Sequence, residues 1–290
     1  MRGRPEKTSY AGLPPSVTPV SHAVARPGGE EGPPNFAIAT LEFFLARAGV
    51  ARSVGLGGGA MTQFAGFPRS FFAFFRELKA NNDRAWFEAN KQRFREEVQG
   101  PMSDFIAAMT PHLGKLSKHF VADPRPNGGS MFRIYRDVRF SKDKRPYKEH
   151  AACQFRHRFG RDVHAPGFYV HLAHDEVFFG GGMWMPESDA LLKIHQRIAE
   201  RPADWKKVIN DKRFVQTFGT IEGDQLTRPP KGFDPAHPLI GDIRRKSFVA
   251  GVDSSAKAAQ SPAFAEEVAQ SFRALSPLMR FLCSALDVPY

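Results

Sequence analysis

The hydrophobic pattern of the chain changes its period twice, and this change limits the folds that the chain can adopt. Between residues 68 and 116, apolar residues such as Phe71 and Phe75 recur at the spacing of a helix. Between residues 150 and 180 they alternate with other residues, as they do in strands. From residue 186 onward the helical spacing returns. This order of helices, strands and helices predicts an α+β fold rather than repeated βαβ units.

The alternating residues divide into several short predicted strands. The first, 132–140, is either a strand or a strand that runs into a loop, with one exception to the alternation at Arg136. The others are 153–159, 168–173 and 176–179. We expect a hairpin turn at His174 and Asp175, and we expect the glycines 180–182 to end the last strand. The stretch 219–252 is expected to be irregular with further short strands. Because the connections are too short for parallel crossovers, we predict an antiparallel sheet of about four to six strands, packed by N-terminal, middle and C-terminal helices.

The first 60 residues differ from the rest of the chain in composition. They contain 10 Gly and 7 Pro, so regular structure is interrupted throughout. A glycine run at residues 55–59 is typical of a flexible linker, and a second methionine, Met61, follows it. We therefore predict that residues 1–60 are a disordered or dispensable extension. Residues 61–290 are predicted to form a single globular domain.

Charge and composition exclude several classes of protein. Lys and Arg number 41 against 30 Asp and Glu, which gives a net charge of +11 and favours anionic partners such as nucleic acid or phosphorylated metabolites. The two cysteines, Cys153 and Cys283, are too few for a disulfide scaffold. No apolar run approaches the length of about 20 residues that a membrane span needs. Without an export signal, we expect a cytoplasmic protein that does not bind membranes.

The most informative local feature is a basic segment, residues 133–150, with seven Lys or Arg and three acidic residues. Arg133, Arg136 and Arg139 recur at every third position beside apolar residues. A guanidinium is a planar fork that binds carboxylate or phosphate through two parallel hydrogen bonds. Asp137 is expected to hold one guanidinium in place while the others face a ligand.

Three interpretations of the basic segment stay open. In the first, it forms a pocket for a phosphate- or carboxylate-bearing small molecule, which the protein either binds or transforms. In the second, it belongs to a surface that binds nucleic acid without catalysis. In the third, the arginines and Asp137 form an architectural ion-pair network, and the function lies in contacts with a partner. The first is our leading hypothesis, because clustered arginine suits a defined anion.

The run RIYRDVRFSKDKRPY, residues 133–147, resembles the signature of a bacterial and fungal family known as domain of unknown function 2461. Three further stretches support the resemblance: FPRSFFAFFRELKANNDRAWFEANK near the start, FFGGGMWMP in the middle, and RPPKGFDPAHPLI later. The resemblance covers residues 61–290 and has no counterpart for residues 1–60. It implies the domain limits and supports a site at the basic segment, but it implies no reaction.

The candidate site residues extend beyond the basic segment. The predicted ligand-binding residues are Arg133, Arg136, Arg139, Lys144, Tyr147, Gly181 and Trp184, and the catalytic candidates are Asp137 and Tyr147. Nearby cations are expected to lower the pKa of the Tyr147 phenol. Gly181 belongs to a glycine run before a predicted helix, where backbone N–H groups bind phosphate or where glycine simply permits a tight turn. Trp184 either stacks on a ligand or fills the core.

The ten histidines lack the spacing of a metal site. The closest grouping is His164, His171 and His174 with Asp175. We therefore predict no metal and no cofactor. His150 and His157 lie near the basic segment and are candidates for acid–base work, because histidine titrates near neutral pH.

Overall fold

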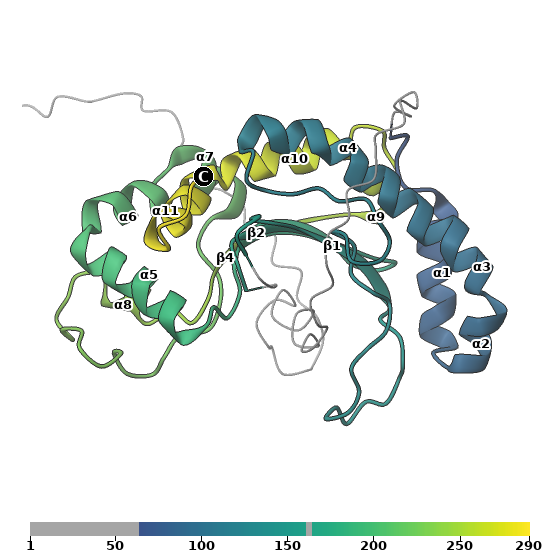
Figure 1. Ribbon diagram of the computed structural model, residues 1–290, viewed down its shortest axis with the longest axis horizontal. Helices are drawn as coiled ribbons and strands as arrows, with labels where there is room; N and C mark the ends of the chain where they lie inside the picture. The colour runs from purple at the N-terminus through teal and green to yellow at the C-terminus, as the bar shows by residue number, and fades with distance from the viewer. Residues whose placement is uncertain (1–63, 161–163) are drawn as a thin grey trace, which may run out of the picture. The chain divides into compact units, whose positions relative to one another are not determined.

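Four strands form one antiparallel sheet in the part of the chain that the structure describes. This part of the computed structural model comprises residues 64–160 and 164–290 (Figure 1), and the predicted extension, residues 1–60, lies outside it. The strands are β1 (His150–Arg156), β2 (Gly167–Ala173), β3 (Val177–Met183) and β4 (Phe248–Ser254). They pair in the order β1-β2-β3-β4, and each pair is antiparallel. The predicted α+β class and the range of strand number are therefore confirmed.

A nearly continuous series of helical segments precedes the sheet. It consists of α1 (Arg69–Ala80), α2 (Arg84–Ala89), α3 (Lys91–Arg93), the π-helix η2 (Phe94–Gln99) and α4 (Gly100–Leu116). Phe71 and Phe75 of α1 are fully buried, as the helical spacing predicts. Asp83 caps α2, because its carboxylate accepts the backbone N–H of Trp86 at 2.9 Å.

The remaining helices follow β3 and β4. They are α5 (Ser188–Glu200), α6 (Pro202–Ile209), α7 (Lys212–Phe218), α8 (Ile240–Ile243), α9 (Ala256–Ala259), α10 (Phe264–Ala274) and α11 (Ser276–Ala285). Helix α10 packs against both α4 and β3, and α11 packs against β3 and α6 (Figure 1). The N-terminal and C-terminal helices therefore share one core with the sheet. Within residues 64–160 and 164–290, no helix is long and apolar enough to cross a membrane.

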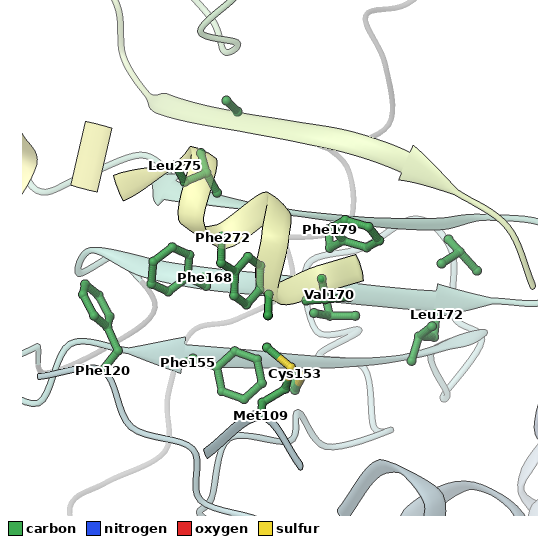
Figure 2. Packing of buried hydrophobic residues seen from close by; sticks show 14 of the residues in the cluster. Met109, Phe120, Cys153, Phe155, Phe168, Val170, Leu172, Phe179, Phe272 and Leu275 are labelled. Atoms are coloured by element: carbon green, nitrogen blue, oxygen red, sulfur yellow. The ribbon is translucent and has the colours of Figure 1, made fainter. Parts of the chain in front are cut away.

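One face of the sheet supplies the apolar core. Cys153 and Phe155 of β1 and Phe168 and Val170 of β2 are buried on this face, against α10 (Figure 2). The ring of Phe272 from α10 stacks on Phe168 with centroids 4.5 Å apart. Removing such apolar area from water is the main stabilising term of the fold. Burial also raises the pKa of the Cys153 thiol, which makes this cysteine an inert core residue.

The prediction that Gly180 to Gly182 end the third strand is wrong, because all three residues lie inside β3. A Cβ atom on Gly180 would collide with the carbonyl oxygen of Ala250, and one on Gly182 would collide with that of Phe248. Gly182 also has a φ of +132°, a conformation that favours glycine. The glycines therefore permit the backbone of β4 to approach β3 closely.

The predicted strand 132–140 is also wrong, because only isolated bridges occur there, such as the one between Tyr135 and Tyr147. Asp137 accepts the backbone N–H of Arg139 at 3.2 Å. A local side-chain bond of this kind folds the backbone into a turn and competes with strand pairing. The stretch 219–252, which we expect to be irregular with short strands, contains the short helix α8 and the start of β4.

We predict that Gly182→Ala destabilises the protein by at least about 2 kcal/mol, because the new methyl group adds a backbone collision to an unfavourable φ. Gly114→Ala is the matched control, since Gly114 lies in α4 and a Cβ there meets no atom within 4 Å. This control should stabilise the protein by about 0.5–1 kcal/mol through helix propensity. Urea denaturation of both variants measures the difference. Equal stability of the two variants would contradict the packing of β3 on β4.

Candidate functional site

A hairpin-like arm, residues 133–148, precedes β1 in the chain (Figure 1). Two backbone hydrogen bonds hold its sides together. The Arg136 N–H donates to the Pro146 carbonyl at 2.9 Å, and the Lys148 N–H donates to the Ile134 carbonyl at 2.7 Å. The arm therefore brings most of the predicted basic segment into one folded unit.

Ion pairs brace the arm from within. Nη1 of Arg136 lies 2.8 Å from Oδ2 of Asp143 on the opposite side. Arg145 shares this carboxylate at 2.7 Å, and Arg139 pairs with Asp137 at 2.6 Å. The hydrogen bonds from Arg139 lower the pKa of Asp137 to about 2. Asp137 thus orients Arg139, and at neutral pH it is an anion with no proton to donate.

Lys144 and Tyr147 also make contacts that hold the arm in place. Nζ of Lys144 donates to the carbonyl of Val138 at 2.9 Å. Tyr147 is buried, and its ring stacks on Phe87 with centroids 4.1 Å apart. The side chain of Asn82 exchanges two hydrogen bonds with the backbone of Tyr147. Burial raises the pKa of Tyr147, which is opposite to the effect that we expected from nearby cations.

Arg133 lies at a different place, in a cavity between the base of the arm and the helices. This cavity, which we call the cationic pocket, has a volume of about 220 Å³. Its charged lining residues are Lys91, Arg95 and Arg133, and none of its eleven lining residues is acidic. Rings of Phe87, Phe94, Phe132 and Tyr135 form much of the remaining wall, with Ile134, Gln99, Pro126 and Asn127. The pocket therefore combines positive charge with aromatic surface.

The π-helix η2 shapes one side of the cationic pocket. Phe94, Arg95 and Gln99, which line it, all belong to this six-residue segment. A π-helical turn is less stable than an α-helical one and occurs frequently at functional sites. Lys91 pairs with Glu88 on the surface at 2.9 Å. Neither Arg95 nor Arg133 forms an ion pair with a described residue, so both charges are available to a ligand.

Sequence reasoning missed Lys91 and Arg95 as site residues. One signal was present, because the two cations are four residues apart and share a helix face beside Phe94. What the sequence does not indicate is that Arg133, about 40 residues later, joins them. The local spacing of Arg133, Arg136 and Arg139 suggests convergence, but the folded arm separates Arg133 from the others.

Gly181 and Trp184 lie apart from the cationic pocket. Gly181 is inside β3 on the core side, where a Cβ would be 3.2 Å from Cδ1 of Leu275. Trp184 follows β3 and is half-buried, and its carbonyl oxygen lies 2.9 Å from Nδ1 of His164. The structure therefore does not bring these two predicted residues together with the arginines.

The other face of the sheet carries a group of polar side chains that we call the polar sheet face: His150, Tyr169, His171 and Glu176. The Tyr169 hydroxyl lies 3.2 Å from Nδ1 of His171, and Oε2 of Glu176 lies 3.6 Å from Nε2 of the same ring. The ring centroids of His150 and His171 are 4.2 Å apart. A carboxylate, an imidazole and a phenol in series have the chemistry to move a proton.

Burial controls the charge of the two histidines on the polar sheet face. It lowers the pKa of His171 to about 3. Burial, and then the neighbouring groups His171, Lys148 and Arg136, lower the pKa of His150 well below its usual value of 6.5. Both rings are therefore neutral at physiological pH. Protonation of either ring is unfavourable, because it would bury a positive charge.

The other predicted histidines are engaged elsewhere. Nδ1 of His174 lies 3.3 Å from Asp175, and Nε2 of His157 lies 2.7 Å from the carbonyl oxygen of Pro289. In the described part of the chain, no three His, Cys, Asp or Glu side chains form a group suited to a metal ion.

We predict that acid destabilises the protein through His171. Its folded pKa of about 3 lies below the unfolded value of 6.5, so the unfolded state binds the proton first. The free energy of unfolding should fall as the pH drops below 6.5, by up to about 1.4 kcal/mol per pH unit for this histidine. His171→Gln should reduce this slope in urea denaturation between about pH 6.5 and 5. An unchanged slope in the variant would show that His171 is not the titrating group.

Comparison with known proteins agrees with the resemblance in the sequence. Residues 70–281 match the family model described as conserved hypothetical protein (DUF2461). This stretch contains the arm, the cationic pocket and all four strands. A comparison with curated proteins gives no significant match. Because the family model covers most of its length, the chain belongs to the DUF2461 family.

Proposed function

We propose that the protein binds a phosphate- or carboxylate-bearing small molecule in the cationic pocket. The observation that carries this proposal is the composition of the wall, which contains three cations and no acidic residue. Lys91 is paired with Glu88, whereas Arg95 and Arg133 make no ion pair with a described residue, so an anionic ligand would balance their charge. Arg95 and Arg133 offer planar forks that bind an anion through paired hydrogen bonds.

The size of the pocket and the aromatic residues in its wall indicate the kind of ligand. A volume of about 220 Å³ lies below the range of roughly 300–1,000 Å³ that is usual for drug-sized ligands, so a small metabolite suits it best. Phe94 and Tyr135 provide ring surface for the part of the ligand that carries no charge. The proposed ligand is therefore a small organic anion rather than a polymer.

The remaining basic residues of the arm support a positioning role. Arg136 and Arg139 are paired with carboxylates, and Lys144 bonds a backbone carbonyl. These contacts hold the arm whose base supplies Arg133 and Tyr135 to the pocket. In this proposal, Arg136, Arg139 and Lys144 brace the arm, and Arg133 binds the ligand.

We predict that Arg95→Gln and Arg133→Gln each weaken anion binding by at least about tenfold, because each removes a charge-assisted hydrogen bond to the ligand. Isothermal titration calorimetry with inorganic pyrophosphate and with citrate measures the effect and separates phosphate from carboxylate recognition. Arg213→Gln is the matched control, since Arg213 is an exposed cation on α7 outside the pocket. It should bind both probes as the unaltered protein does.

Two results would count against the proposal. The first is that neither probe binds the full chain at millimolar concentration. The second is that the Arg213 variant loses as much affinity as the two pocket variants, which would indicate attraction by net charge alone.

A further inference from the structure

The tip of the arm presents an aromatic ring to solvent. The side chain of Phe140 is 94% exposed, more than any other large hydrophobic residue in the described part of the chain. Tyr147 on the same arm is buried, so the exposure of Phe140 is not a property of the whole arm. An isolated apolar side chain on a surface needs no special explanation. The surroundings of Phe140, however, give it a specific chemistry.

Cations outnumber carboxylates near the ring along the chain. Residues 139–145 contain Arg139, Lys142, Lys144 and Arg145. Arg139 pairs with Asp137, and Arg145 pairs with Asp143 and Glu149. The Arg139 guanidinium carbon lies 5.7 Å from the centroid of the Phe140 ring. Lys142 is exposed and makes no ion pair with a described residue. The tip therefore combines one flat apolar surface with an exposed lysine two residues away.

The ion pairs of the arm fix this tip in advance of any encounter. The Arg136–Asp143 pair crosses the arm between its two sides, and Lys144 bonds the carbonyl of Val138 next to the tip. A loop that is already braced loses less conformational entropy on binding than a free loop does. The arm is therefore built to present Phe140 rather than to fold it back.

We propose that the arm tip binds single-stranded nucleic acid, with Phe140 stacking on a base and Lys142 contacting a phosphate. Bases in a single strand expose their flat faces, and stacking on an aromatic side chain is favourable for every base. A lipid surface fits less well, because stable anchoring needs more than one apolar group and Phe140 has polar neighbours, Arg139 and Ser141. This inference does not depend on the cationic pocket.

Fluorescence anisotropy of the full chain with a labelled oligothymidylate of about 20 nucleotides tests the inference. Phe140→Ala should weaken binding by at least about fivefold, as expected for the loss of one stacked base. Phe140→Trp should retain the affinity, because it keeps a ring. Phe159→Ala is the matched control, since Phe159 is 61% exposed and lies outside the arm; it should bind normally.

Salt dependence separates the cations from the ring. Lys142→Gln should reduce the slope of log affinity against log salt by about 0.7, the value for one phosphate contact on a single strand. Phe140→Ala should leave this slope unchanged while it lowers the affinity. Arg95→Gln should leave oligonucleotide binding unchanged, because Arg95 lines the cationic pocket and not the arm tip. The test of the arm tip is therefore independent of the pocket proposal.

Three outcomes would overturn the inference. One is that the oligonucleotide does not bind the unaltered chain at about 50 mM salt, where phosphate contacts are strong. Another is that Phe140→Ala binds it as tightly as the unaltered chain does. The third is that Phe140→Ala loses binding to vesicles of phosphatidylserine and phosphatidylcholine but not to the oligonucleotide, which would assign the tip to a membrane surface.

Discussion

The ion pair between Arg136 and Asp143 is the interaction on which the proposed binding surfaces depend. The two side chains are 13% and 37% exposed, so water screens their attraction less than it does for the outer pairs of the arm. The pair joins the two sides of the arm, whose base carries Arg133 and Tyr135 and whose tip carries Phe140. Hydrogen bonds from Arg145 and Arg136 hold the pKa of Asp143 well below its usual range. The brace is therefore present throughout the physiological pH range.

The sequence is sufficient to predict the α+β class, because the period of apolar residues is a local property and each element buries its expected face. The glycines 180–182 show where local reasoning fails. Three glycines in a row are typical of a turn. They lie in β3 because β4, some 65 residues later, passes so close that a Cβ would collide with its backbone. No pattern near residue 180 carries that information.

The candidate site was predictable in composition but not in geometry. Arginine-rich sequence draws attention to residues 133–147, whose Asp and Arg side chains pair within the segment. The helix against which the arm packs decides which arginine lines the cationic pocket and which arginines form ion pairs within the arm. Lys91 and Arg95 line the cationic pocket with Arg133 because η2 faces the base of the arm, and this is a tertiary contact between distant parts of the chain.

Lys148 links the arm to the sheet and so connects the two groups of polar residues. It is buried two residues before β1, and its Nζ donates to the carbonyl of Arg133 at 3.1 Å. The same ammonium, together with Arg136, disfavours a second positive charge on His150. A protonated His150 would therefore repel the groups that fix the base of the arm. His150 therefore stays neutral beside Lys148 at physiological pH, and its ring adds no repulsion to this junction of the arm and the sheet.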